Sequence, residues 1–370
     1  MKVIIFFTYG ISLNDWKTSG LLEREVKLYN YLNQKYNVKF VFITYGDATD
    51  VDILKNYNHI KVIPIYQYFK KSKYKVVEII KSFTYSFRLK KVTSLDNSIL
   101  KTNQLWGSWI ALFIKLKNGN PLIVRTGYDL LDFKRKEKAP DYKIFFYKLL
   151  TKYAIKFSDK YLVTSTSDLT RIKKEFSTRD GVLEKLSNWV EFPILENKSR
   201  FSDRVISVGR LEEQKNYPYL IKSFANSELQ IDIVGQGSKK EELESLSESH
   251  KARINFLGRL GNDELIKKLG EYKYYVSSTL YEGNPKAILE AMAAGCIVIA
   301  PNVEGVHEII ENRHSGILYN FTEDNLVLII KNLETDSIDS ISENARQYIR
   351  NNHTLEAVAA KEYAIYEELL

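Results

Sequence analysis

Two glutamates eight positions apart, Glu282 and Glu290, stand in the stretch LYEGNPKAILEAMAAG among residues that are otherwise mostly small or apolar. The NP dipeptide followed by apolar residues predicts a helix that starts with Asn284 as N-cap and Pro285 at its first position. Glu282 then lies at the mouth of the helix and Glu290 inside it. Carboxylates so placed can accept hydrogen bonds from sugar hydroxyls, and the helix amides favour an anion such as phosphate.

An alternative stays open for Glu290. Lys286 precedes it by four residues, which is the spacing of an ion pair on the surface of a helix. A solvated Glu290 that pairs with Lys286 would have no part in ligand binding.

A pair of cations follows another strand-like run, in VGRLEEQKNYPYLIKSF, where Gly209 precedes Arg210 and Lys215. Arginine as a planar fork and lysine as a point charge can hold a diphosphate between them. The alternative is an ordinary surface pair that bridges to Glu212 or Glu213.

Two further strand ends carry glycines. VGQGSKKEELESL has Gly235 and Gly237 ahead of a helical pattern, where the missing Cβ atoms let a backbone pass close to a ligand. The third glycine of a dinucleotide-binding motif is missing, so an NAD site is a weak interpretation. Leu257 belongs to LGRL, which is a third strand end and by itself does not indicate a function.

Short apolar runs alternate with helical patterns along the whole chain, which predicts parallel sheets covered by helices on both faces. Ligands of such folds bind beyond the carboxyl ends of the strands, where the residues above lie. The length of 370 residues fits two domains. SNWVEFPILENKSR, residues 187–200, has no clear periodicity and is the predicted linker. Two doubly wound domains facing each other would place a cleft between them.

Charge divides the chain at the same place. Residues 1–190 contain 34 Lys and Arg against 17 Asp and Glu, whereas the remainder contains 20 against 29. The one cysteine, Cys296, excludes an intramolecular disulfide and reads as a buried structural thiol. The sequence shows neither a signal peptide nor a membrane span, so we expect a cytoplasmic protein.

The basic character is strongest between Lys70 and Lys91, with eight Lys or Arg, one acid and interleaved aromatic residues. Val76, Ile80, Phe83 and Phe87 share one helical face. The simpler interpretation is a helix that packs this face into the core. The alternative is contact with an anionic membrane surface. Nucleic-acid binding has no recognition motif to support it, so we expect no nucleic-acid partner.

The DVD sequence at Asp50–Asp52 could be mistaken for a metal-binding motif, but helix capping or solvation explains it better. We predict no metal and no cofactor.

Read together, SVGRLEEQKN, IVGQGSKKEELE, INFLGRL, YVSSTLYEGNPKAILEAMAAGCIVIAP and GVHEIIENRHSGILY resemble, in order and spacing, retaining glycosyltransferases of family 4. The paired glutamates resemble that family's E-x7-E motif. The resemblance covers the second half of the chain. It implies the GT-B fold, with two Rossmann-like domains and a C-terminal helix that crosses back to the first domain. The implied boundaries are 1–186 for an acceptor-binding domain, 187–200 for the linker, 201–350 for a nucleotide-sugar domain and 351–370 for the crossover helix.

The resemblance also implies roles for single residues. Arg210 and Lys215 would hold the donor diphosphate and stabilise the leaving nucleotide, Glu282 would contact the donor sugar, and Glu290 would bind ribose hydroxyls. The remaining implied donor contacts are Gly20, Gly209, Gly235, Gly237, Leu257, Asn284, Lys286 and Ala287. Pro285 stands where relatives offer an amide and has none to give.

The first domain departs from the family. Its glycine turn is reduced to Ser19-Gly20, and the histidine that contacts the sugar is missing from PLIVRTGYDLLDF. Arg125 or Tyr128 is the tentative substitute for sugar or acceptor contacts.

The implied function is metal-independent, retaining transfer of a hexosyl group from a UDP- or GDP-sugar to a hydroxyl of a glycan or lipid-linked acceptor. The setting would be cell-surface polysaccharide or glycolipid synthesis, with the protein cytoplasmic or peripheral at the inner face of the membrane. The alternative is a non-catalytic nucleotide-sugar-binding subunit or a nucleotide-sugar epimerase.

Overall fold

The computed structural model describes residues 1–89, 92–194, 199–333 and 335–370. Their contacts divide the chain into two units, one formed by Met1–Leu186 with Ala359–Leu370 and the other by Ser187–Val358. The predicted linker 187–200 starts where the second unit starts, and its residues 195–198 lie outside the described residues.

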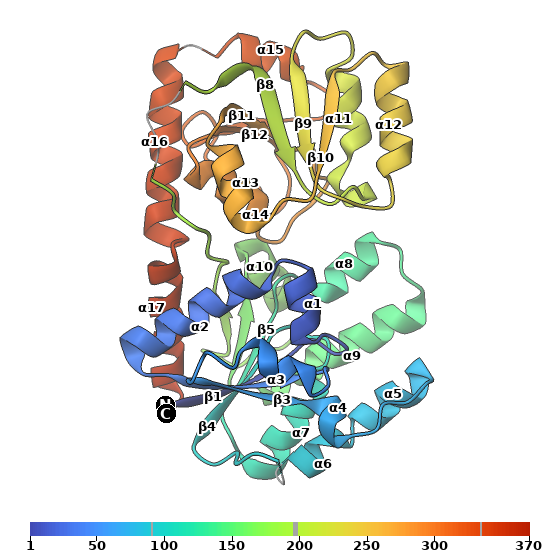
Figure 1. The fold of residues 1–370 in the computed structure, drawn as a ribbon, viewed down its shortest axis with the longest axis vertical. Helices are drawn as coiled ribbons and strands as arrows, with labels where there is room; N and C mark the ends of the chain where they lie inside the picture. The colour runs from blue at the N-terminus through green and yellow to red at the C-terminus, as the bar shows by residue number, and fades with distance from the viewer. Residues whose placement is uncertain (90–91, 195–198, 334) are drawn as a thin grey trace. The chain divides into compact units, whose positions relative to one another are not determined.

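The first unit is built on a seven-stranded parallel sheet in the order β3-β2-β1-β4-β5-β6-β7, shown with its helices in Figure 1. The strands are β1 (Lys2–Phe6), β2 (Lys39–Thr44), β3 (Ile60–Pro64), β4 (Ser98–Thr102), β5 (Leu122–Arg125), β6 (Lys160–Val163) and β7 (Leu183–Lys185). The helices are α1 (Leu13–Thr18), α2 (Leu22–Tyr36), α3 (Thr49–Ile53), α4 (Ile65–Tyr68), α5 (Lys75–Ser82), α6 (Tyr85–Leu89), α7 (Trp109–Asn118), α8 (Leu130–Lys136), α9 (Asp141–Phe157) and α10 (Thr166–Glu175).

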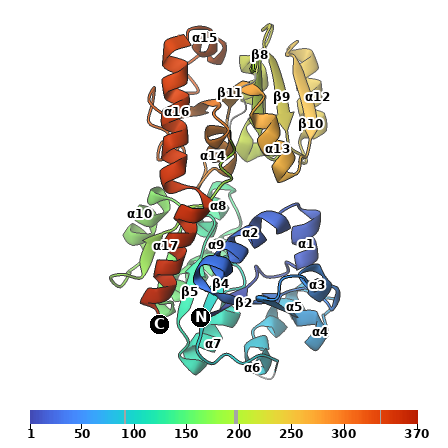
Figure 2. The same cartoon turned by 60° about the vertical axis from the view of Figure 1, so that its left-hand side comes forward.

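The C-terminal helix α17 (Leu355–Glu368) completes this unit, and both views place it beside α2 (Figures 1 and 2). Tyr363 stacks on Tyr36 of α2 with ring centroids 3.9 Å apart. Deeper in the unit, Glu362 forms a buried ion pair with Lys101 of β4. The last helix is therefore an integral part of the first unit, as the predicted crossover requires.

The second unit has a six-stranded parallel sheet in the order β10-β9-β8-β11-β12-β13. The strands are β8 (Phe201–Val208), β9 (Gln230–Val234), β10 (Ile254–Gly258), β11 (Tyr272–Val276), β12 (Ile297–Pro301) and β13 (Ile317–Tyr319). The helices are the 3-10 turn η1 (Glu213–Lys215), α11 (Tyr217–Ser223), α12 (Lys240–Ser249), α13 (Asn262–Leu269), α14 (Lys286–Ala293), α15 (Leu326–Lys331) and α16 (Thr335–Asn352).

The central strands are largely apolar because both faces of each sheet are covered. Β12, for example, is buried at every position, and Cys296 just before it is buried as predicted. Among the described residues, no helix has both the length and the apolar character needed to cross a bilayer.

Each sheet reverses its strand order once, between β1 and β4 in the first unit and between β8 and β11 in the second. Such a reversal leaves a crevice at the carboxyl ends of the two central strands, which is where open α/β sheets bind ligands.

Candidate functional site

Two predicted site loops leave the adjacent central strands of the second unit. Residues 209–215 follow β8, and residues 277–285 follow β11, its hydrogen-bonded neighbour. The structure thus brings the Arg210–Lys215 segment and the Glu282 segment to the same reversal of strand order, although they are far apart in sequence.

Hydrogen bonds hold these two loops together. The amide of Leu280 donates to the carbonyl of Gln214 at 2.9 Å, and the side chain of Gln214 donates to the carbonyl of Tyr281 at 2.8 Å. The Ser278 hydroxyl donates to the carbonyl of Lys215 at 2.7 Å. Since backbone groups of both loops are engaged, the loops form one preorganised surface.

Lys215 and Glu282, which the sequence assigns to diphosphate and sugar, form an ion pair across this surface. The Thr279 hydroxyl donates to the same carboxylate oxygen at 2.9 Å. For Lys215 the alternative of an ordinary surface pair with Glu212 or Glu213 is therefore wrong, because Lys215 pairs with Glu282. Glu212 accepts from the amide and hydroxyl of Ser238, at 3.0 Å each, and Arg210 acts on it electrostatically. The side chain of Arg210 is exposed.

Glu290 is 5% exposed, so the alternative of a solvated carboxylate is wrong. Its pairing with Lys286 is real, at 3.4 Å, and the Lys286 ammonium lies 5.6 Å from the ring centroid of Trp189. Burial raises the pKa of the Tyr275 hydroxyl well above its usual range, and the charges of Glu282 and Glu290 raise it further. Both carboxylates therefore act on one buried hydroxyl of β11, which sequence reasoning had not marked.

The helix that carries Glu290 starts later than predicted. It runs from Lys286 to Ala293 with Pro285 as N-cap, and its first hydrogen bond joins the Leu289 amide to the Pro285 carbonyl at 3.1 Å. Asn284 is not the cap because its side-chain oxygen accepts a 3.0 Å hydrogen bond from the amide of Asn188. The amides of the first turn point out of the helix end, beside Glu282 in sequence.

The glycines serve close backbone packing. A Cβ atom at Gly235 would lie 1.9 Å from the carbonyl oxygen of Gly209, and one at Gly237 would lie 2.3 Å from that of Leu211. The β9–α12 turn is thereby pressed against the loop that carries Arg210. Leu257 packs partly buried against the core of this unit.

Sequence reasoning missed one glycine at the site. Gly305 has φ +80°, and a Cβ atom there would lie 2.2 Å from the carbonyl oxygen of Glu282. The amide of Glu282 donates to the carbonyl of Glu304 at 3.2 Å. Glu304, Gly305 and Val306 follow β12, and a glycine in a loop directly after a strand is a turn signal. That signal could have identified Gly305 as part of the site.

The predicted residues of the first unit each have their own surroundings. Gly20 lies in the exposed turn between α1 and α2 with φ +69°. Tyr128 is half-exposed, its ring 4.7 Å from that of Phe133. Arg125 acts electrostatically on the buried pair of Lys101 and Glu362.

Asp50 of the DVD sequence is a buried capping residue, as predicted. Its carboxylate accepts from the amides of Leu13 at 3.0 Å and Asn14 at 3.2 Å, at the start of α1, and from the Thr44 hydroxyl at 2.6 Å. Within the described part of the chain, no three His, Cys, Asp or Glu side chains gather as metal ligands would.

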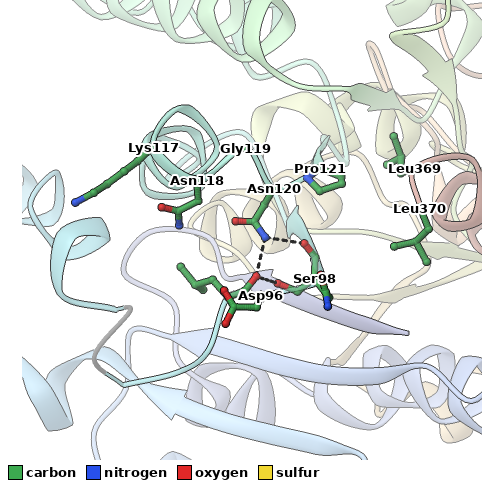
Figure 3. A pocket seen from close by; sticks show the side chains of 11 residues that line it. Asp96, Ser98, Lys117, Asn118, Gly119, Asn120, Pro121, Leu369 and Leu370 are labelled. Carbon is green, nitrogen blue, oxygen red and sulfur yellow. Dashed lines mark hydrogen bonds between the residues drawn. The ribbon is translucent and has the colours of Figure 1, made fainter.

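A separate pocket of about 710 Å³ lies in the first unit, where β4 and β5 begin (Figure 3). Asn120 donates across it to the carbonyls of Leu95 at 2.7 Å and Ser98 at 3.0 Å. It contains none of the predicted site residues.

Comparison with known proteins finds similarity to glycosyltransferases. The family model described as "Glycosyl transferases group 1" matches residues 195–354, which is most of the second unit. An uncharacterized glycosyltransferase of Haemophilus influenzae is 28% identical over 206 residues, covering 50% of this chain and 54% of its own. The "GalNAc-alpha-(1->4)-GalNAc-alpha-(1->3)-diNAcBac-PP-undecaprenol alpha-1,4-N-acetyl-D-galactosaminyltransferase" of Campylobacter jejuni is 25% identical, covering 90% of this chain and 89% of its own. The chain spans about half the length of some of these curated relatives.

Solved structures match over the whole chain. Anabaena Alr3699/HepE in complex with UDP has a TM-score of 0.76 at 15% identity and covers all of both chains. A sucrose-phosphate synthase of Thermosynechococcus elongatus has a TM-score of 0.80 at 16% identity and covers 100% of this chain and 99% of its own. These likenesses confirm the predicted fold class, with two Rossmann-like units as in GT-B proteins.

Proposed function

We propose that this protein is a glycosyltransferase that moves a sugar from a nucleoside-diphosphate sugar to a hydroxyl of a lipid-linked saccharide. The observation that carries the proposal is the meeting of Lys215 and Glu282, from two loops, at the reversal of strand order in the second unit. The match of this unit to the group 1 glycosyl transferase model supports it.

The donor is bound by the second unit. Arg210 and Lys215 hold the diphosphate, and the amides at the start of α14 add the positive end of the helix dipole. Glu282 accepts hydrogen bonds from the donor sugar. Glu290 uses the acceptor capacity left beside Lys286 to bind ribose hydroxyls, since a carboxylate accepts about four hydrogen bonds.

The reaction breaks the bond between the anomeric carbon and the diphosphate oxygen and forms a bond from that carbon to the acceptor oxygen, and the proton of the acceptor hydroxyl passes to the leaving diphosphate. Negative charge grows on the leaving diphosphate, where Arg210, Lys215 and the helix amides stabilise it. In the proposed mechanism these groups suffice without a metal ion, and the acceptor attacks from the face that the nucleotide leaves, which retains the anomeric configuration.

UDP is the first nucleotide to test, because the Anabaena neighbour was solved with UDP and with UDP-glucose. A lipid-linked acceptor is supported by the names of relatives that act on diphospho-undecaprenol saccharides.

The test is a thermal-shift panel of UDP, GDP, ADP and their sugars on the wild type and on Glu290→Ala, with Glu248→Ala as a matched surface control. We expect one nucleotide series to raise the Tm of the wild type and of the control but not of Glu290→Ala. Equal stabilisation of all three proteins, or of none, would refute the donor site.

Once the donor is identified, NMR of the product measures its anomeric configuration and so tests retention. Activity that is lost with EDTA and restored by Mg²⁺ would contradict metal independence. Reversible interconversion of free nucleotide sugars would identify an epimerase instead.

A further inference from the structure

The helix predicted to pack its apolar face into the core turns that face outward. Val76 and Ile80 of α5 are 69% and 64% exposed, and Phe87 of α6 is 57% exposed. The segment is broken between α5 and α6, so of the predicted face only Phe83 packs against the core. The core-packing interpretation of this segment is therefore wrong.

A second helix of the same unit also exposes large apolar side chains. In α9 these are Tyr142, Phe145, Phe146 and Tyr153, of which Tyr142 and Phe145 are 70% and 63% exposed. The buried side of α9 is formed by other residues, Leu150, Thr151, Ala154 and Ile155. The aromatic side chains are thus not needed for the core of the unit.

The helices that carry these residues lie side by side, since α5 contacts α6, α6 contacts α7 and α7 contacts α9, and aromatic contacts link them in the interior of the unit. Phe83 at the end of α5 stacks on Trp109 of α7 at 5.2 Å, Trp109 contacts Trp106 at 5.2 Å, and Trp106 contacts Phe146 of α9 at 5.9 Å. Between them α7 exposes Phe113 and Leu116. In Figure 1, α5 and α9 both reach the right-hand edge of the first unit.

Exposed basic side chains lie on the same helices and on the loop before α5, and Asp141 of α9 is an exposed acid among them. The basic ones include Lys70, Lys71, Lys73, Lys75, Lys81, Arg88, Lys117, Lys143 and Lys152. The one acid of α5, Glu78, is buried and accepts from the amide of Ser72 at 2.6 Å and from the Tyr85 hydroxyl. The exposed charged side chains of α5, Lys75 and Lys81, are therefore all basic.

We propose that this surface, formed by the exposed apolar and basic residues of α5, α6, α7 and α9, docks on an anionic lipid bilayer. Large exposed apolar patches mark interaction sites. Exposed aromatic and aliphatic side chains together with Lys and Arg match the boundary between headgroups and acyl chains, and each basic residue near an anionic leaflet contributes about 1 kcal/mol.

The positive charge of the surface favours an anionic bilayer over a second copy of the chain as its partner. A symmetric dimer through the surface would bring the same lysines face to face, and like charges brought together cost several kcal/mol. An anionic leaflet offers the opposite charge and an apolar interior at once. The inference stands independently of the proposed reaction, because it depends on residues of the first unit alone.

The test is co-sedimentation of the full chain with vesicles of phosphatidylcholine alone or with 30% phosphatidylglycerol. We expect binding to the anionic vesicles that falls at least tenfold when NaCl rises from 50 to 500 mM, because salt screens exposed charges. Phe145→Ser combined with Ile80→Ser should lower the binding at least tenfold at low salt. Leu328→Ser, at an exposed leucine of α15 in the second unit, should leave it unchanged.

Equal binding to both vesicle types, or none to either, overturns the proposal. So does a dimer that dissociates in the double variant, or a variant that binds as the wild type does. Wild-type Tm values and an unchanged nucleotide shift in the double variant show that it is folded and that loss of lipid binding does not reflect loss of the donor site.

Discussion

The amide of Asn188 donates a 3.0 Å hydrogen bond to the side-chain oxygen of Asn284, which precedes the helix of Glu290. The carbonyl of Asn188 in turn lies 2.9 Å from Nδ1 of His353 at the end of α16. The start of the second unit is thus fastened to the proposed donor loop and to the junction of α16 with α17.

Asn284→Ala removes the side-chain acceptor of the Asn188 amide, and the loss of this hydrogen bond should cost about 1–2 kcal/mol. We expect the Tm of the variant to fall by about 2–6 °C. Asn284→Asp keeps an acceptor at that position, so its Tm should stay near the wild type. Its added negative charge should still weaken UDP binding beside the diphosphate site. Calorimetry and a UDP titration of both variants check this, and equal Tm losses would contradict it.

Lys215→Ala should lower kcat/KM by about a hundredfold to a thousandfold, because it removes a cation at the place where negative charge develops. Lys215→Arg keeps the charge beside Glu282 and should lose less. Steady-state kinetics with the donor found by thermal shift check this. An alanine variant within threefold of the wild type would rule out the assigned role.

Gly305→Ala should destabilise the second unit by about 3 kcal/mol or more, since the added Cβ would meet the Glu282 carbonyl at 2.2 Å and φ is +80°. Gly261→Ala is the matched control, because nothing lies within 4 Å of a Cβ there and its φ of −65° suits alanine. The control should cost about 1 kcal/mol or less as a helix N-cap change. Urea unfolding with UDP titration measures both, and similar losses would remove the steric explanation.

Lys101→Met leaves Glu362 buried without its ion-pair partner, which should cost about 3–5 kcal/mol near pH 7. The double variant Lys101→Met with Glu362→Leu should recover most of this loss, because apolar replacements of a buried pair are often neutral. Urea unfolding of the three proteins checks both expectations, and a double variant no more stable than the single one would contradict them.

The same pair makes the loss depend on pH. Burial alone would raise the pKa of Glu362, but the attraction of Lys101 and Arg125 outweighs it, and the pKa lies below its usual range. A lowered carboxyl pKa contributes stability above the unfolded pKa, about 4.5, and that contribution is lost as the pH falls. In Lys101→Met the pKa of Glu362 should be raised instead, so the difference between wild type and variant should shrink towards pH 4. A constant difference from pH 4 to 7 would refute this.

The alternation of apolar strands and helices was enough to predict two parallel-sheet domains, and the fold of the solved neighbours confirms it. The loops that carry Arg210, Lys215 and Glu282 were also found from sequence. The carboxyl ends of parallel strands meet at one edge of a sheet, so residues that directly follow such strands are brought together by any doubly wound order.

Sequence periodicity could not decide what covers each face. The spacing of Val76, Ile80 and Phe87 defines an apolar stripe, but whether core or solvent meets it depends on helices far along the chain. The same limit applies to Glu290, whose local alternatives were open until tertiary packing buried it in its pair with Lys286.

Contacts across long stretches of sequence were decided only by the tertiary structure. Asn188 reaches Asn284, and Lys101 reaches Glu362, because strand order and the return of α17 to the first unit bring them together. The sequence by itself determined which residue types stand at the strand ends, since that pattern is local. Which side chains are buried, which are paired, and which apolar residues of α5 and α9 stay exposed was decided only by the packing of distant elements. The reason is that the hydrophobic effect is non-directional and does not specify which partner an apolar face meets.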